Sequence, residues 1–449
     1  MALQMKNRRG RLVPHGPIGV VGFLTGISLL LPFLGRTFLF SVGIHPRWLS
    51  YVALILIVTM VWNIRGLRAH RTASRDVIHM HMAVGALVVF ALVMFPWGEE
   101  FWVTADAPSL AQYPGEKITD FILVSVPFIA LAWVVHPYAR KPDFVNGLAA
   151  ASMFVGAIGL WEVFSFRDIV GNFDEFASVG FGTISLSMVL LFAIIGAAHW
   201  LRTEPTATRF YWFLALSAAC LWSIFLVAQR TSMLLGLAFV LFMTSRFIIR
   251  RRTILISLAI IVALAATAGT LVKGLDGFQA GDDLPRQTAR FTSVFTSQDT
   301  STNARLEMWA FSWEAWFQQP FGRGFGSFAE EFPDLKFPHN IPVEAFYELG
   351  FVGGIAALYL IGLTVRAIVR LGRTAGAELY LLALVTALAM VLKAEDFASM
   401  GFWLFWLAMG TSVVEEQSRR TIQTSALGKT ERTPQDDYLP LAVRLGRWR

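Results

Sequence analysis

The chain has 449 residues, of which 55% are hydrophobic and only 15% are charged, and its mean hydropathy is +0.56. This composition excludes an ordinary soluble domain and indicates a polytopic membrane protein. The formal net charge is +7, but the Lys and Arg residues lie mostly in short segments between apolar runs. That distribution is typical of membrane topology and argues against nucleic acid as a partner.

Apolar runs of roughly 20 residues, long enough to cross a bilayer, recur from Pro17 to Val414. The first follows a basic N-terminal segment without a small-residue cleavage site, so we expect an uncleaved helix. The pattern predicts an all-α fold with about twelve membrane helices. Their predicted ranges are 17–42, 49–64, 77–97, 121–136, 144–164, 179–200, 210–228, 231–249, 253–273, 341–368, 379–393 and 400–414.

The charge of the connecting segments alternates along the chain. Segments 65–75, 136–143, 201–209, 246–252 and 369–378 are basic, which predicts a cytoplasmic location. Segments 97–120, 165–178 and 393–400 are acidic or nearly neutral, as expected on the outer side. Both termini are then cytoplasmic, and the polar residues 415–449 are predicted to form a flexible cytoplasmic tail. Nine helices thus fall within residues 1–273 and three within residues 341–414.

Residues 274–340 form a long outer loop between the ninth and tenth predicted helices, and loops of this length usually serve a function or are disordered. The spacing in "TNARLEMWAFSWEAWFQQP" predicts a helix, with Asn303 as its cap and Pro320 ending it. One face of this helix carries an apolar set: Leu306, Trp309, Trp313, Trp316 and Phe317. Such a Trp-rich face is typical of a helix at the lipid interface, and it is also compatible with a site sheltered beneath it.

Metal and thiol chemistry find little support in the sequence. Cys220 is the only cysteine and lies in an apolar run. Asp282 and Asp283 are adjacent and so point apart, while the segment "HMHM" at 79–82 falls on the cytoplasmic side. We therefore expect neither a metal site nor a cofactor.

Three arginines are candidates for binding an anion on the outer side. Arg230 lies at the tip of a tight hairpin between two apolar runs, where a charge is costly unless it is paired; a snorkelling contact with lipid phosphate is the alternative. Arg305 opens the Trp-rich helix. Arg323 lies in "PFGRGFGSF", whose glycines allow close backbone approach to a ligand or simply a flexible link.

His339 leads directly into the tenth predicted helix, in the segment "KFPHNIPVEAFYELG". Histidine titrates near neutral pH, which suits it to proton transfer. The same segment is also typical of a helix start, with Asn340 as N-cap and Pro342 in the first turn. Asn340, Glu344 and Glu348 then share one helix face, and Glu344 is expected to be solvated.

One set of residues resembles the signature of the bacterial O-antigen ligase and polysaccharide polymerase superfamily. It consists of Arg230, Arg305, Trp309, "PFGRGFGSF", His339, Asn340, Glu348, Gly350 and Gly353. The resemblance covers mainly residues 225–360. It implies a glycosyltransferase of the GT-C-like membrane type in the bacterial inner membrane, with its active site at the periplasmic face. The ligase branch transfers polysaccharide from undecaprenyl diphosphate to a sugar hydroxyl of lipid A-core.

The resemblance also implies roles for individual residues. His339 would act as general base on the acceptor hydroxyl, while Arg230 and Arg305 would clamp the diphosphate without a metal ion. Asn340, Glu348 and Arg323 would contribute to substrate binding, with Glu348 orienting His339 or fixing the mouth of the helix. A single attack opposite the leaving group would invert the anomeric carbon.

Three other functions remain open from the sequence. A polymerase of the same superfamily often shows a Pro-Asn pair where this chain has "NFDEF", which favours the ligase. A protein O-oligosaccharyl transferase would share the donor, and nothing in the sequence identifies the acceptor. A secondary transporter would also have about twelve helices, but its two halves tend to be similar, whereas the halves here differ and the candidate residues gather at one outer face.

Overall fold

The computed structural model describes residues 16–33, 52, 55–58, 60–61, 117, 121, 125–165, 183–227, 229–248, 300–332, 338–393 and 400–430. The predicted helices 77–97 and 253–273 and most of 49–64 lie outside the described residues. So do the "NFDEF" segment, Asp282, Asp283 and the "HMHM" segment.

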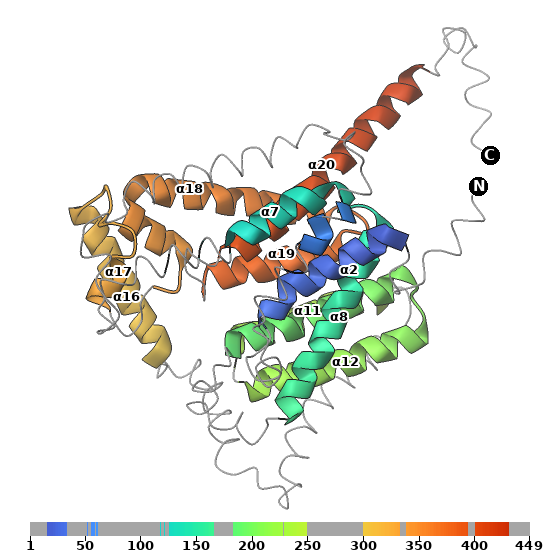
Figure 1. Cartoon of the computed structure of the whole chain (residues 1–449), viewed down its shortest axis with the longest axis horizontal. Helices are drawn as coiled ribbons and strands as arrows, with labels where there is room; N and C mark the ends of the chain where they lie inside the picture. The colour runs from blue at the N-terminus through green and yellow to red at the C-terminus, as the bar shows by residue number, and fades with distance from the viewer. Residues whose placement is uncertain are drawn as a thin grey trace, which may run out of the picture.

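The described residues are helical, and no strand occurs among them (Figure 1). The helices are α2 (Gly16–Leu30), η1 (Leu31–Phe33), α7 (Val126–Val135), η5 (His136–Tyr138), α8 (Pro142–Ser165), α11 (Thr183–Thr203), α12 (Ala207–Leu226), α13 (Arg230–Ile248), α16 (Thr300–Gln318), α17 (Phe328–Glu331), α18 (Ile341–Gly372), α19 (Glu378–Val391) and α20 (Gly401–Thr430).

Four helices are long and apolar enough to cross a membrane, judged by length and composition: Pro142–Ser165, Ile184–Thr203, Ala207–Leu226 and Ile341–Gly372. Shorter apolar helices accompany them at Gly16–Leu30, Val126–Tyr138, Arg230–Ser245 and Glu378–Val391. The structure is thus that of an all-α membrane protein, as predicted. The total of twelve helices stays a prediction.

Small residues let the membrane helices pack closely. A Cβ added at Gly22 of α2 would lie 2.1 Å from the carbonyl oxygen of Phe144 in α8, and one at Gly147 would lie 2.1 Å from that of Gly19. Only glycine permits this backbone contact, which is a usual basis of helix association in lipid. On its other side α8 packs against α11, whose residues from Leu186 to Ala198 are buried at the centre of the bundle (Figure 1).

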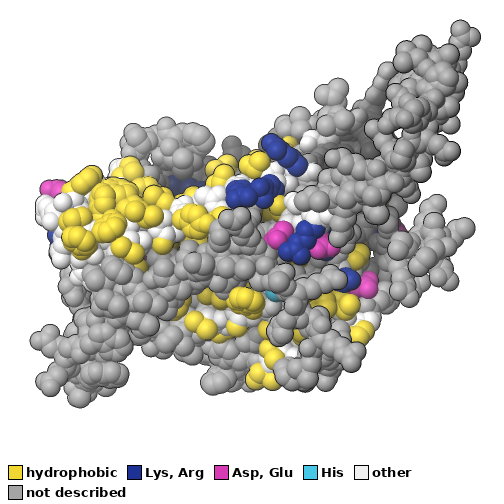
Figure 2. All heavy atoms as spheres, turned by 90° about the horizontal axis from the view of Figure 1, so that it is seen from above, with side chains coloured by type: hydrophobic (Ala, Val, Ile, Leu, Met, Phe, Trp, Pro, Cys, Tyr) yellow, Lys and Arg dark blue, Asp and Glu magenta, His cyan; other side chains and the backbone are white. Residues whose placement is uncertain are grey.

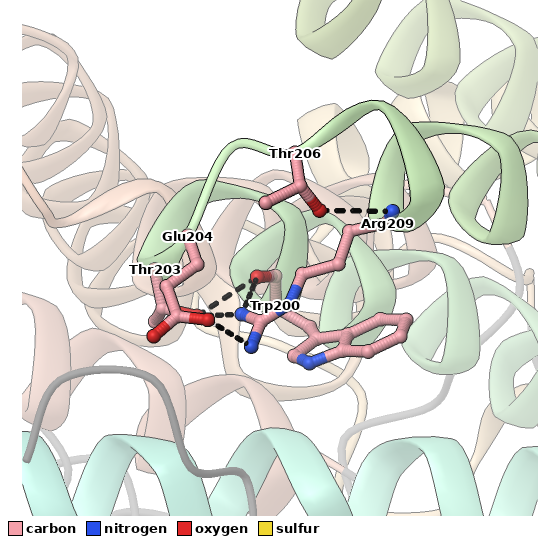
Figure 3. Close-up of polar contacts among 5 residues, drawn as sticks. All are labelled: Trp200, Thr203, Glu204, Thr206 and Arg209. Atoms are coloured by element: carbon pink, nitrogen blue, oxygen red, sulfur yellow. Dashed lines mark hydrogen bonds and ion pairs between the residues drawn. The ribbon is translucent and has the colours of Figure 1, made fainter.

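At one end of the bundle, polar contacts join the predicted cytoplasmic segments to one another and to neighbouring helices. In the turn between α11 and α12, Arg209 donates to the carbonyl oxygen of Trp200 at 3.2 Å and pairs with Glu204 at 2.5 Å (Figure 3). Arg202 forms an ion pair with the buried Glu378 of α19. Three of the basic segments, 136–143, 201–209 and 369–378, therefore gather here, since Tyr380 also donates to the carbonyl oxygen of Ala139 at 2.6 Å.

The opposite end carries α16, α17 and the start of α18 (Figure 1). The face of α16 that packs inward holds the buried Met308, Ser312 and Ala315, and of these Met308 and Ala315 cluster with Phe328 and Tyr347. The predicted apolar face is divided: Leu306 and Phe317 are exposed, whereas the rings of Trp313 and Trp316 contact that of Phe346 in α18. Figure 2 shows a patch of hydrophobic side chains over this end of the molecule.

Two predictions about helix ends are wrong. Helix α16 begins at Thr300, so Asn303 lies inside it and is not its cap, although the helix does end shortly before Pro320. Helix α20 continues past Val414 to Thr430, where a flexible tail was expected from residue 415. Loss of hydropathy marks where a helix leaves the membrane, and a helix can continue beyond that point.

Candidate functional site

Helix α18 is broken near its start. Gly350 has φ 63° and ψ −158°, a conformation that L side chains rarely adopt, and the helix direction changes there. All ten residues from Ile341 to Gly350 are buried, whereas the rest of α18 has exposed side chains such as Ile355 and Leu358. We call residues 341–350 the half-helix.

The glycine-rich segment "PFGRGFGSF" supplies hydrogen-bond partners to the backbone groups at the break in α18. The backbone amides of Arg323 and Gly324 donate to the carbonyl oxygens of Tyr347 and Glu348 at 3.1 and 3.0 Å. In return, the amide of Phe351 donates to the carbonyl oxygen of Pro320 at 2.9 Å. These bonds satisfy backbone groups that the interrupted helix cannot pair internally, which is required wherever water is excluded.

The approach of the two backbones depends on glycine at both positions. A Cβ at Gly322 would lie 2.4 Å from the carbonyl oxygen of Glu348, and a Cβ at Gly350 would lie 2.3 Å from the carbonyl carbon of Phe321. Both glycines also have positive φ. The glycine pattern in the sequence is therefore explained here by contact with the broken helix, a use that the sequence did not reveal.

His339 occupies a tight turn directly before the half-helix. Its φ is 55°, which makes it the one described non-glycine residue with positive φ. On one side, the carbonyl oxygen of Pro338 accepts a 2.9 Å hydrogen bond from the indole Nε1 of Trp309. On the other, the side-chain Nδ2 of Asn340 donates to the carbonyl oxygen of Leu392 at 3.0 Å. Helices α16 and α19 thus hold this turn from both flanks.

Asn340 is the N-cap of α18, as predicted. Its Oδ1 accepts a hydrogen bond from the amide of Val343 at 3.2 Å, and its backbone is extended. The same side chain serves two purposes, because its Nδ2 is the group that reaches Leu392. A single residue therefore starts the half-helix and attaches it to the end of α19.

Glu344 and Glu348 are not solvated, which corrects the expectation for Glu344. Each is 1% exposed, and both face the ammonium group of Lys117, itself 1% exposed. The Nζ of Lys117 donates to Glu348 Oε1 and Oε2 at 2.8 and 2.6 Å and forms an ion pair with Glu344. The ring of Phe325, from the glycine-rich segment, lies 4.9 Å from this Nζ. Glu348 therefore contacts Lys117 near the start of α18.

Arg230 is the first residue of α13 and is half-buried. The next residue, Thr231, accepts a hydrogen bond from Lys393, which follows directly after Leu392 at the end of α19. Since Leu392 accepts from Asn340, α19 connects the start of α13 to the His339 turn. The structure thereby brings Arg230 to the same end of the molecule as His339.

The other two candidate arginines occupy different positions. Arg305 is half-buried on α16, one helical turn before Trp309, the residue that contacts the His339 turn. Arg323 lies over the ring of Tyr347 at 5.6 Å, and its Nη1 is 3.5 Å from Glu331. Its contacts with neighbouring side chains are those of a residue that supports the loop.

Sequence reasoning missed Lys117 and Lys393. Both were counted as part of outer segments and given no role. The sequence did contain a signal for Lys117, because two carboxylates one turn apart at the start of an apolar run require a cation as a partner. The sequence did not say which cation, because Lys117 and Glu348 are separated by 231 positions.

The described residues thus define an α-helical membrane protein with a polar site where four helices meet, and no group of three metal-binding side chains occurs among them. Residues 215–358 match the family model described as O-antigen ligase. This match confirms the resemblance to the O-antigen ligase superfamily, and the matched segment contains every candidate site residue. No curated protein gives a significant match to the chain.

Proposed function

We propose that the protein is an O-antigen ligase. It transfers polysaccharide from undecaprenyl diphosphate to a sugar hydroxyl of lipid A-core, at the periplasmic face of the bacterial inner membrane. The family match over residues 215–358 supports this class of activity. The choice of the ligase within the superfamily rests on the sequence around "NFDEF", where polymerases often carry a Pro-Asn pair.

The single observation that favours His339 as the reactive group is the geometry of its turn. A histidine with positive φ is costly, by about 1–2 kcal/mol, and persists only where the surroundings impose it. Here hydrogen bonds to Pro338 and from Asn340 fix the residues on either side. Such a fixed, strained position is typical of a functional side chain.

The proposed reaction is a direct displacement. The acceptor hydroxyl oxygen attacks the anomeric carbon while His339 removes its proton, and the bond from that carbon to the diphosphate oxygen breaks with its electron pair going to the diphosphate. Attack from the opposite face inverts the anomeric carbon. Arg230 and Arg305 neutralise the departing charge through paired N–H donors, so that the reaction proceeds without a metal ion.

The remaining candidates serve the substrates less directly in this scheme. Asn340 and Glu348 shape the start of α18, and Arg323 supports the glycine-rich segment beside it. Membrane lipids are expected partners at the apolar surfaces. A polymerase or a protein O-oligosaccharyl transferase would use the same donor chemistry and differ in the acceptor, whereas a secondary transporter is disfavoured by the family match.

The test uses purified full-length protein supplied with lipid-linked glycan and lipid A-core. We expect transfer by the wild type and losses on the order of 100-fold or more for His339→Ala, Arg230→Ala and Arg305→Ala. Arg419→Ala, at an exposed position on α20, is the matched arginine control and should leave transfer unchanged. Transfer that survives all three substitutions would reject the proposal, and glycan extension without lipid A-core would indicate the polymerase.

A further inference from the structure

The half-helix is joined to the rest of the protein by lateral contacts. At Gly350 the break removes the continuous backbone hydrogen bonds that would otherwise align residues 341–350 with the rest of α18. The orientation of the His339 turn therefore depends on what touches the half-helix from the side. Asn340, the cap directly before the half-helix, attaches its start to α19, and the glycine-rich segment attaches its last turn.

Lys117 contacts the half-helix between its two ends. Its ammonium contacts Glu344 and Glu348, which lie one turn apart along the half-helix, and so spans its middle. The same ammonium lies against the ring of Phe325 in the glycine-rich segment. One side chain thus joins three parts of the chain: the segment before α7, the half-helix and the loop that repairs the break.

Electrostatics makes the loss of the lysine from this cluster costly. Both carboxylates and the ammonium are excluded from water, where an uncompensated charge is far more costly than at a surface. Without the lysine, two carboxylates would lie side by side in an apolar environment. The half-helix could not keep its present position with both of them ionised.

We infer that Lys117 is a positioning residue, whose ion pairs with Glu344 and Glu348 hold the half-helix so that His339 is aligned for proton transfer. The inference rests on the proposed function, because it takes His339 as the base. A small displacement of a base from its productive geometry lowers the rate of the chemical step, whereas substrate binding is little affected.

Three variants separate positioning from mere folding. Lys117→Arg keeps a cation and should retain most of the activity. Lys117→Met leaves two buried carboxylates and is expected to unfold readily. The triple variant Lys117→Met with Glu344→Gln and Glu348→Gln removes every charge of the cluster, so it should fold. The double variant Arg202→Met with Glu378→Gln is the control, because it removes both charges of an ion pair that joins α11 to α19 at the other end of the molecule.

For the triple variant we expect kcat to fall on the order of 100-fold with KM for both substrates unchanged. The control variant Arg202→Met with Glu378→Gln should leave kcat and KM at the wild-type values. A triple variant with wild-type kcat would overturn the inference. A rise in KM at constant kcat would also overturn it, because it would assign the cluster to substrate binding.

A second measurement does not depend on activity. Trp313 of α16 and Phe346 of the half-helix have ring centroids 5.1 Å apart. In a Cys220→Ala background, Trp313→Cys with Phe346→Cys should be joined efficiently by a short bifunctional thiol reagent, and more slowly in the triple variant. Equal rates would overturn the inference. If wild-type protein transfers no glycan, the proposed function fails, and the crosslinking rates still decide whether Lys117 holds the half-helix.

Discussion

The indole Nε1 of Trp309 donates a 2.9 Å hydrogen bond to the carbonyl oxygen of Pro338, the residue directly before His339. This bond connects α16 to the turn that starts α18. It gives the tryptophan a specific role besides that of an aromatic anchor at a lipid surface. It also brings the helix that carries Arg305 to the turn that carries His339.

Trp309→Phe keeps the ring and removes the N–H donor. Because the buried carbonyl oxygen of Pro338 then loses a partner, we expect a loss of about 1 kcal/mol in stability and a decrease in transfer of roughly fivefold. Thermal denaturation and initial rates measure the two effects. Trp313→Phe, at a more exposed position on the same helix, is the control and should behave like wild type. Equal effects of the two substitutions would contradict this role of Trp309.

Substitutions of His339 should separate backbone strain from chemistry. Asparagine tolerates positive φ better than alanine, so His339→Asn should fold like wild type while His339→Ala loses about 1 kcal/mol. Both should lose transfer by about 10²- to 10⁴-fold, because neither supplies a base. Thermal denaturation alongside transfer rates tests both statements. An active His339→Asn variant would exclude histidine as the base.

Asn340 combines a helix cap with a contact to α19. Asn340→Ala removes both and should cost about 2 kcal/mol, taken as about 1 for the cap and about 1 for the bond to Leu392. Serine restores the cap but is too short to reach Leu392, so Asn340→Ser should recover about half of that loss. Thermal denaturation of the two variants provides the comparison. If serine recovers nothing, the cap contributes little here.

Glycine is required at position 350 for two reasons, its positive φ and its contact with Phe321. Gly350→Ala should therefore destabilise the protein by more than about 1 kcal/mol and lower transfer. Gly362→Ala is the matched control, since it lies in the same helix and an added Cβ there meets nothing within 4 Å. We expect that variant to be neutral or slightly stabilised, by up to about 1 kcal/mol. Similar melting temperatures for the two variants would contradict the requirement for glycine at position 350.

The sequence predicted the features that depend on local pattern. Apolar run length gave the all-α class and most described helix positions, and the segment "PHNIP" predicted the cap at Asn340. Local pattern was not sufficient at the start of α16, where several neighbouring residues favour the same capping role. Thr300, Ser301, Thr302 and Asn303 all suit the first turn or cap, and the predicted cap was the wrong one.

Features that depend on distant partners were not predictable. The break at Gly350 looks like an ordinary glycine in a membrane helix, because the groups that complete it come from residues 320–324. Glu344 looked solvated for the same reason, since its partner Lys117 belongs to another part of the chain. Pattern along one helix carries no information about which other segment lies beside it.

The docking of Pro320, Arg323 and Gly324 against the break in α18 has a consequence for how the protein is made. During membrane insertion, the break leaves backbone groups without partners until this loop arrives, so α18 can be fully accommodated only after the loop has docked. The loop is synthesised before α18, so it is available to dock as soon as the helix enters. Biogenesis of this helix depends on a segment that precedes it in the chain.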